Sequence, residues 1–515
     1  MNAEKHAEKY LTGDYLLKGE FLKMSAMRES VLTRAERYAG WTMPTIFPDN
    51  SVGSDEEFQN DFQSVGAQAV NNLSNKIMMA LFQPSRPFFR LTLTDEQKEE
   101  VLSENVGLDT ADIQEALAAS ERGSMRELEK INARVTMTDC ILQLIITGNA
   151  LMYMPDAGGM QAYSLRDYVI ERDLRGNTVK IIIQETKAVS ALSDELANIA
   201  AEQNILEDAE VTIFTGIQRV GKDHFVVWQE LEDLCSCHLK VGHYKEDDLP
   251  WLPLTWALAR NKDYGTGLVE MYAGDFHTLS TLAEAILDYT VIITDVKILV
   301  DPTGMTDVRK ITEAASGEYV HGREEDLYVH TANVQAASDF LLNQFQAVER
   351  RIAAAFLLNN SVTRDAERVT AEEIRMQAQE LEGSYGGVYS RLATDMQLPL
   401  AKRLIKKFDP ILKEVEPVIV TGLDSLSRNS ELDRTRAFFN DLVSLSDVPE
   451  EVALRIDYGK LIAMLGAGHG ITYGDLLKSE EEVKAAQAQQ AQQEAQAAGQ
   501  MAQAEAQAQP PTGPQ

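Results

Sequence analysis

Residues 267–299 form a long proline-free stretch with helical spacing, and this stretch limits the possible folds more than any other feature. Apolar side chains recur every three or four residues, as on one helical face, at Tyr272, Phe276, Leu279, Leu282 and Ile286. An unbroken helix of this length would be about 50 Å long, far longer than an average helix of three or four turns. The segment DPTGM then breaks the pattern, and a second helical pattern covers residues 335–356. The sequence therefore predicts two helical arms with a small compact module between their far ends.

Length and composition indicate a globular chain with room for several packed layers. The chain has 515 residues, 44% hydrophobic and 25% charged, and this length predicts roughly three domains. Its formal net charge is -32, from 80 acidic and 48 basic residues. Proteins whose main task is to hold nucleic acid cluster their lysines and arginines, so we expect any contact with nucleic acid to be loose.

Targeting and redox features predict a protein made inside a cell. The N-terminus, MNAEKHAEKY, lacks the apolar core of a signal peptide. The most apolar run, AILDYTVIITDVKILV, contains two aspartates and a lysine, which are costly in lipid, so no transmembrane helix is expected. Three cysteines are an odd number for a disulfide framework and too few for a zinc site without histidines. We expect reduced, structural thiols at Cys140, Cys235 and Cys237.

The chain as a whole predicts an α+β fold that is mainly helical, and its strands are expected within residues 150–256. Helical patterns cover residues 7–39, 66–82 and 109–147, the last ending at Gly148, a natural helix stop. The segment FFRLTLT between the last two is extended. Residues 150–256 contain six strand-like segments, LMYMP, YVIER, VKIIIQ, VTIFTGIQRV, HFVVWQEL and CHLKVGHY, with RGN and GKD as turns. A helix is predicted to interrupt them at residues 189–207.

A helix with a well-defined start follows the second arm. Thr370 is a good N-cap, and Glu373 can return a hydrogen bond to its N–H. Apolar residues at helical spacing continue to Met396 through three glycines, Gly383, Gly386 and Gly387. Each glycine inside a helix costs about 1 kcal/mol relative to alanine. We therefore predict that they bend the helix or admit a close neighbour.

Polar segments flank this part of the chain. Residues 359–364 carry hydrogen-bond donors but no apolar stripe, which predicts a loop directly before the capped helix. Further on, helices are predicted at residues 429–445 and 449–465, and a third begins at Thr472. Beyond Lys484 the chain is almost only Ala, Gln and Glu. Such a tail has little apolar surface to bury, so we expect a frayed helical or disordered end.

No motif has convincing catalytic or metal-binding spacing. GIQRVGK, residues 216–222, fits a phosphate-binding loop until Asp223 takes the place of the magnesium-binding Ser or Thr, and a strand pattern follows, so a plain β-hairpin is predicted. GAGHG, residues 466–470, has no preceding strand and predicts a helix stop and linker. In CSCH, residues 235–238, strand geometry would make a poor tetrahedral site. We predict no catalytic residue, no metal and no cofactor.

Five blocks of sequence resemble, in the same order, those of the portal protein, or head-to-tail connector, of short-tailed, podovirus-type bacteriophages. The blocks are GAQAVNNLSNKIMMALFQP, LIITGNALMYMPD, YGTGLVEMYAGDFHTLSTLAEAI, GEYVHGREEDL and ERVTAEEIRMQAQELEGSYGGVYSRLATDMQLPL. The resemblance extends over residues 25–480. The shared order of the blocks is more specific than any single motif.

The resemblance implies a portal fold with wing, stem, clip and crown, whose subunits assemble as a ring. It assigns residues 1–266 to the wing, with a helical N-terminal part and an α+β part. Two stem helices, residues 267–299 and 335–357, would enclose the clip, residues 300–334, in chain order. A tunnel loop (358–369), a long wing helix with its return (370–428), the crown (429–482) and a flexible Ala/Gln-rich tail (483–515) would follow.

The resemblance also implies a function without enzymatic activity. Twelve copies would form a channel at one capsid vertex, through which double-stranded DNA is packaged and later ejected. The implied partners are other copies of the chain, double-stranded DNA held weakly and without sequence preference, the terminase large subunit, tail adaptor and tail proteins, capsid and scaffolding proteins, and internal core proteins, with no membrane. The implied location is the portal vertex of the virion, after assembly in the host cytoplasm.

Two groups of site residues follow from the resemblance. The tunnel loop lining the channel would present Asn359, Asn360, Ser361, Thr363, Arg364 and Arg368. Its two arginines are offset by Asp365 and Glu367, so the ring would lack the dense positive collar that holds phosphates. The clip would dock terminase and then the tail adaptor through Arg309, Lys310, Arg323 and Glu324.

Two alternatives remain at the level of sequence. A hydrolase in the α+β region would use His224 or Glu230 beside the Gly-rich turn, and it would need a mutual geometry that sequence does not show. A helical phage assembly or scaffolding protein without a channel would suit the Ala/Gln-rich tail.

Overall fold

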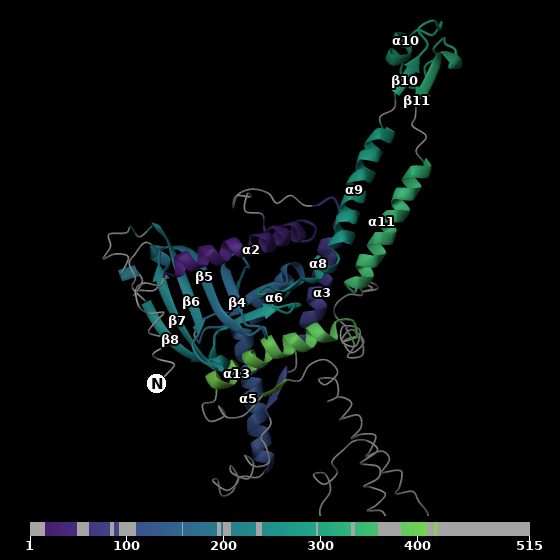
Figure 1. The fold of residues 1–515 in the computed structure, drawn as a ribbon. Helices are drawn as coiled ribbons and strands as arrows, with labels where there is room; N and C mark the ends of the chain where they lie inside the picture. The colour runs from purple at the N-terminus through teal and green to yellow at the C-terminus, as the bar shows by residue number, and fades with distance from the viewer. Residues whose placement is uncertain are drawn as a thin grey trace, which may run out of the picture. The chain divides into compact units, whose positions relative to one another are not determined.

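The chain divides into two compact units, Met1–Gly422 and Leu423–Gln515, and the described residues all lie in the first (Figure 1). The computed structural model describes residues 16–48, 61–82, 87–91, 110–156, 158–192, 197–198, 206, 208–232, 239–294, 297–330, 335–358, 383–408 and 417–419. The tunnel loop from residue 359, the capped start of the following helix, the predicted helices after residue 428 and the tail lie outside these residues.

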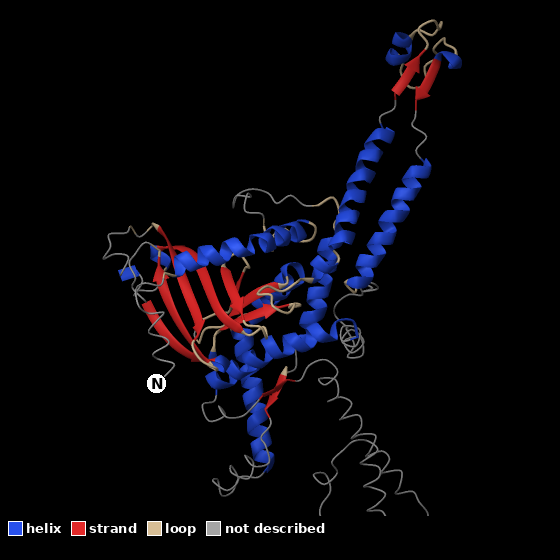
Figure 2. Cartoon of the chain, in the orientation of Figure 1, coloured by secondary structure: helices blue, strands red, loops and turns tan. Residues whose placement is uncertain are grey.

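The largest sheet is an antiparallel meander of five strands in chain order (Figure 2). Its strands are β4 (Tyr168–Arg172), β5 (Thr178–Ala188), β6 (Glu210–Arg219), β7 (His224–Leu231) and β8 (Leu239–Lys245). Both faces are buried, because Ile182 packs toward the helix α2 (Leu17–Gly40), whereas Ile181 and Ile183 join the main core. The predicted hairpin after Gly216 is confirmed, with Arg219 opposite Phe225.

A smaller sheet and two helices complete the body around this meander. In it, β2 (Asn149–Tyr153) lies between β3 (Gln161–Tyr163) and β9 (Trp251–Thr255). The helices α3 (Val65–Leu81) and α6 (Ala133–Thr147) pack against each other and bury Val70, Leu73, Ile77, Ile141 and Ile145. A third sheet pairs β1 (Phe89–Leu91) with β12 (Pro417–Ile419). All six segments predicted as strands contribute strands.

The single helix predicted for residues 109–147 is wrong. The structure has two helices, α5 (Thr110–Lys130) and α6, separated at Asn132, whose backbone is left-handed with φ of 52°. Asparagine tolerates this conformation better than most residues. One helix can therefore end there and a second helix begin in a new direction. The predicted stop at Gly148 is confirmed by its φ of 80°. Within α6, Cys140 is a buried free thiol whose pKa burial raises, as expected for a structural cysteine.

The predicted arms are present, but the first is shorter and interrupted. It consists of α8 (Leu268–Met271) and α9 (Ala273–Thr294), and Lys297–Val300 is the strand β10 instead of helix. The prediction of helix up to Leu299 is wrong because KILV finds a partner in β11 (Leu327–His330). The second arm, α11 (Gln335–Ala355), matches the prediction. The two arms lie side by side (Figure 1), and Arg351 donates to the Asp275 carboxylate at 2.6 Å.

The stretch predicted as a helix after Thr370 is described from residue 383, where it is helical. It runs through a π-helical turn, η5 (Ala393–Gln397), into α13 (Leu398–Phe408). Leu392 and Met396 are buried on the predicted face. A Cβ added to Gly383, Gly386 or Gly387 would meet nothing within 4 Å, so these glycines have no close neighbour among the described residues of this chain. Of the helix predicted at residues 189–207, the structure describes a short 3-10 turn, Val189–Ala191, and little else.

A tight backbone crossing ties the first arm to the body. A Cβ on Gly148 would lie 2.4 Å from the backbone nitrogen of Gly267, and one on Gly265 would lie 2.7 Å from the carbonyl oxygen of Gly148. The side chain of Asn149 bonds both backbone groups of Gly265, accepting from its N–H at 2.7 Å and donating to its carbonyl at 3.1 Å. The arm begins at Leu268, directly after this crossing.

We expect Gly148→Ala to destabilise the protein strongly, because the new methyl group clashes with backbone and the left-handed φ disfavours alanine. The cost should exceed about 1–2 kcal/mol, seen as a lower midpoint of thermal or chemical unfolding. Gly274→Ala is the matched control, since a Cβ there meets nothing within 4 Å. In the helix α9 this alanine should be neutral or stabilise by up to about 1 kcal/mol. Equal midpoints for the two variants would contradict this account of the crossing.

Candidate functional site

The compact module between the arms consists of residues 297–330. The strands β10 and β11 pair antiparallel, with Lys297 opposite His330 and Val300 opposite Leu327. Between them lie a short helix, α10 (Val308–Glu313), and a 3-10 turn, η3 (Glu324–Asp326). Asp307 caps α10 by accepting from the Arg309 N–H at 3.1 Å.

A buried polar pair holds the module together. The Asp326 carboxylate accepts from the hydroxyl of Thr306 at 2.7 Å and from its N–H at 3.1 Å. The same hydroxyl accepts from the Arg323 N–H at 2.8 Å. A Cβ on Gly304 would lie 2.6 Å from the Asp326 carboxyl carbon, so only glycine leaves room for this carboxylate. Thr306 and Asp326 are the buried side chains among those described in the module, and both are polar.

All four residues predicted for the docking surface lie on this module and are exposed. Arg309 and Lys310 are on α10, while Arg323 and Glu324 are at the turn η3. Thr306 brings the two pairs together, because it directly precedes the α10 cap and bonds the Arg323 backbone. Lys310 lies 3.9 Å from the Asp307 carboxylate, and solvent screens such an exposed ion pair. The role of the four predicted residues in docking stays a prediction.

The surface also has an apolar part, which was not among the residues predicted from the sequence. Tyr319 is fully exposed, Met305 is 83% exposed, and Tyr328, Leu299 and Val308 are also exposed. A clue lay in GEYVHG, where a tyrosine stands in an otherwise polar, glycine-flanked segment. No described apolar side chain of the module is buried, and apolar side chains presented to solvent in this way indicate a surface for another protein.

The outer parts of the arms also expose apolar side chains. Val291 on α9 is 66% exposed, and Phe340 on α11 is 62% exposed. Between residues 284 and 347 no described apolar side chain is buried. At the root of the arms the opposite holds, because Phe356 is buried with its ring 5.5 Å from that of Phe276. The arms are therefore anchored at one end, and further out their described apolar side chains form no buried core.

The predicted tunnel-loop residues Asn359, Asn360, Ser361, Thr363, Arg364 and Arg368 lie outside the described residues. The structure does describe both sides of residues 359–382, up to residue 358 and again from residue 383. The arm α11 ends at Ala355, and the hydroxyl of Tyr385, after the segment, donates to the Ala355 carbonyl. Burial, with the nearby Tyr272, raises the pKa of Tyr385, so its hydroxyl stays a donor at ordinary pH. The described residues on either side of the segment, Ala355 and Tyr385, are therefore joined by a hydrogen bond.

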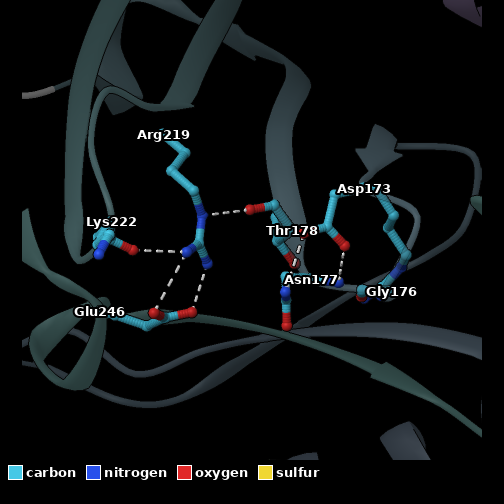
Figure 3. A network of polar contacts seen from close by, with 8 residues as sticks. Asp173, Gly176, Asn177, Thr178, Arg219, Lys222 and Glu246 are labelled. Atoms are coloured by element: carbon cyan, nitrogen blue, oxygen red, sulfur yellow. Dashed lines mark hydrogen bonds and ion pairs between the residues drawn. The ribbon is translucent and has the colours of Figure 1, made fainter.

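The arginine of the phosphate-loop-like string GIQRVGK is bound by other groups of the protein itself. Figure 3 shows the Arg219 guanidinium donating to the carbonyls of Thr178 and Lys222, both at 2.8 Å, and facing the Glu246 carboxylate. The neighbouring turn is closed by Asp173, which accepts from the Asn177 N–H at 2.8 Å. This network joins the ends of neighbouring hairpins, which gives Arg219 and Asp173 a structural role that needs no ligand.

The geometry also argues against the hydrolase alternative. His224 and Glu230 stand six residues apart on β7, which places them about 20 Å from each other along an extended strand. Glu230 is buried and accepts from the Leu17 N–H at 2.7 Å and from the Trp228 indole at 3.0 Å. It caps the start of α2, a structural task.

The rest of the described chain offers few features of a ligand site. No group of three or more metal-ligating side chains is present there. None of the described helices is long and apolar enough to cross a membrane. A cleft of 490 Å³ beside α13 contains Arg403, whose guanidinium is taken up by the Asp156 carboxylate at 2.6 Å and by the Asp248 carbonyl.

Comparison with known proteins assigns the family. A family model described as "Bacteriophage head to tail connecting protein" matches residues 15–476. The chain is 34% identical over 477 residues to the portal protein of Escherichia phage T7, covering 90% of this chain and 88% of that protein. For the portal protein of Enterobacteria phage T3 the identity is 32% over 491 residues, covering 92% and 90%. For that of Enterobacteria phage SP6 it is 34% over 477 residues, covering 91% of each.

The chain therefore belongs to the bacteriophage head-to-tail connecting proteins, the portal proteins, which are structural components of the virion. The resemblance to portal proteins of short-tailed phages is confirmed. Among solved structures, the neck of an empty gene transfer agent particle computed with C6 symmetry matches with a TM-score of 0.34 and 10% identity, over 78% of this chain and 90% of that chain.

We expect Thr306→Val to loosen the module, because valine keeps the shape of threonine but removes its hydroxyl from the buried Asp326 carboxylate. The loss should be about 1–3 kcal/mol of local stability. Hydrogen–deuterium exchange over residues 301–330 measures it as faster exchange. Thr312→Val is the control, because the exposed Thr312 hydroxyl bonds only the Val308 carbonyl of its own helix. If T306V exchanged as slowly as the wild type, the polar pair would not be what holds the module.

Proposed function

We propose that this chain assembles into a ring of twelve copies that forms a DNA channel at one capsid vertex. The observation that carries the proposal is the lack of any buried apolar side chain among the described residues 284–347. Two helices that leave their outer apolar side chains in water need further surface to cover them. Neighbouring copies of the same arm provide it, and identical head-to-tail contacts close into a ring by rotation.

The channel lets double-stranded DNA pass without holding it. A chain with a net charge of -32 has few cations to spare for phosphates. The tunnel loop, residues 358–369, lines the narrowest part of the channel, and neutral donors such as Asn359 and Ser361 face the duplex. In this proposal residues 1–266 form the wing, the two arms the stem, residues 300–334 the clip and residues 429–482 the crown. The ring is assembled in the host cytoplasm and stays at the portal vertex of the virion.

The module of residues 297–330 docks other proteins in turn. The terminase large subunit binds it during packaging, and the tail adaptor and tail proteins replace terminase afterwards. Exposed Tyr319 and Met305 supply apolar contact, while Arg309, Lys310, Arg323 and Glu324 supply the polar rim that gives specificity. Capsid, scaffolding and internal core proteins contact other regions.

Negative-stain images of the purified full-length protein test the ring directly. We expect rings with a central hole, because the exposed apolar side chains of the arms are covered by neighbouring copies. Light scattering of the same sample should give a mass of several subunits. Uniform particles of one subunit at every concentration would contradict the ring and favour a scaffolding factor.

The double variant Met305→Ser, Tyr319→Ser tests the docking surface. It removes two exposed apolar side chains that touch no core, so rings should form as in the wild type. Attachment of tails to filled heads should fall by about tenfold or more, since central apolar anchors carry much of an interface's affinity. Leu174→Ser, at a 76% exposed leucine in the turn after β4, is the matched control. Normal tail attachment by the double variant would exclude these two residues from docking.

A further inference from the structure

The end of α11 has a backbone conformation that its own sequence disfavours. Leu357 has φ of 54°, in the left-handed region. Its N–H donates to the Ala354 carbonyl at 3.3 Å, and the N–H of Leu358 donates to the Ala353 carbonyl at 2.7 Å. These two bonds define a helix stop of the Schellman type, in which the left-handed position is usually glycine. A leucine there is unfavourable because its Cβ crowds the following carbonyl.

Side chains from α3 hold this stop from outside the helix. Lys76 donates from Nζ to the Leu357 carbonyl at 2.7 Å. Asn72 donates from Nδ2 to the same carbonyl at 2.9 Å and to that of Phe356 at 3.3 Å. The two residues are four apart and so share one face of α3. With Tyr385 on the Ala355 carbonyl, the last three carbonyls before the tunnel-loop segment all accept from side chains.

The chemistry of Lys76 suits this task better than it suits a place in the core. Its residue is only 9% exposed, and a buried ammonium is costly unless it is well hydrogen-bonded. The neighbours of Lys76 on α3, Leu73 and Ile77, are apolar and buried, so an apolar side chain would fill such a place more cheaply. A cation at a helix C-terminus is favoured by the helix dipole. The carbonyls of α11 therefore favour a lysine at this position.

We propose that Lys76 and Asn72 are positioning residues that hold Leu357 left-handed and thereby set the point and direction at which the chain leaves the arm. This chain exit leads into the segment that the proposed function assigns to the DNA channel, and the functional part of the inference rests on that assignment. The contact clamps the base of the segment to the body, while Leu357, itself 6% exposed, packs beneath it.

Hydrogen–deuterium exchange of the full-length protein tests the clamp. Lys76→Met keeps the length of the side chain and removes its donors. We expect the amides of Leu357 and Leu358 to exchange about tenfold faster, the size of effect typical of losing a charged hydrogen bond. Lys76→Arg, which keeps donors, should restore most of the protection. Lys23→Met, the same change at an exposed lysine on α2, should leave these amides unchanged.

A double-mutant cycle with Leu357→Gly separates clamping from general packing. Glycine adopts the left-handed conformation without help, so Lys76→Met should have a much smaller effect in the L357G background. An equal effect in both backgrounds, or no change at Leu357 and Leu358 in K76M, would overturn the proposal. If the K76M variant does not unfold cooperatively, Asn72→Ala takes its place in the same double-mutant cycle. This substitution removes only the amide donor.

Phage complementation tests the functional part. Phage carrying K76M should form normal rings and heads but retain packaged DNA less well, by about tenfold, with rescue by K76R. Altered exchange together with normal DNA retention would overturn the link between the clamp and the channel. Failure of the proposed function would look different, because the wild-type protein itself would then form no rings.

Discussion

The structure depends on the backbone crossing of Gly148, Gly265 and Gly267. Atoms of the crossing segments come so close that any side chain at these positions would push them apart. The strand β2 begins on one side of the crossing and the helix α8 on the other, so the body and the arm take their mutual placement from it. Two hydrogen bonds from the Asn149 side chain to the backbone of Gly265 also fix how the two segments are oriented. Contacts between backbones do not repack as long side chains do, which makes the base of the arm a firm mount.

Stability is unevenly distributed along the arms. At their base, Phe276, Ile352 and Phe356 are buried in the main core. Farther out, the helices and the module keep their backbone bonds but bury no described apolar side chain between residues 284 and 347. Hydrophobic burial is the dominant favourable term in folding, so this part gains little of it within one chain. In the proposed ring, neighbouring copies supply the missing surface, and docking partners cover the exposed tyrosines of the module.

Most of the fold followed from local patterns, and the errors have identifiable causes. The hairpins were predictable because alternating strands joined by short turns can pair only with their neighbours. The break at Asn132 was missed because its flanking residues all suit helices, and one left-handed residue changed the direction of the chain. The strand β10 was missed because its partner β11 lies about thirty residues later in the chain. At β10 the helical pattern was overruled by a partner strand that a short window of sequence does not contain, whereas at Asn132 the conformation of a single residue decided the outcome.

For the candidate site, sequence patterns alone established the two arms, the module between them, its charged residues and the family resemblance, because periodicity and residue order are properties of the chain. Three-dimensional packing decided which side chains are exposed and which residues from distant segments contact each other. The sequence does not distinguish Tyr319 and Met305 from ordinary apolar residues, whereas the structure places both in solvent. Lys76 lies 281 residues from Leu357 in the chain, yet its ammonium bonds the Leu357 carbonyl. Such a contact depends on how α3 and α11 pack, and hydrogen bonds between distant segments leave no periodic trace in the residues that make them.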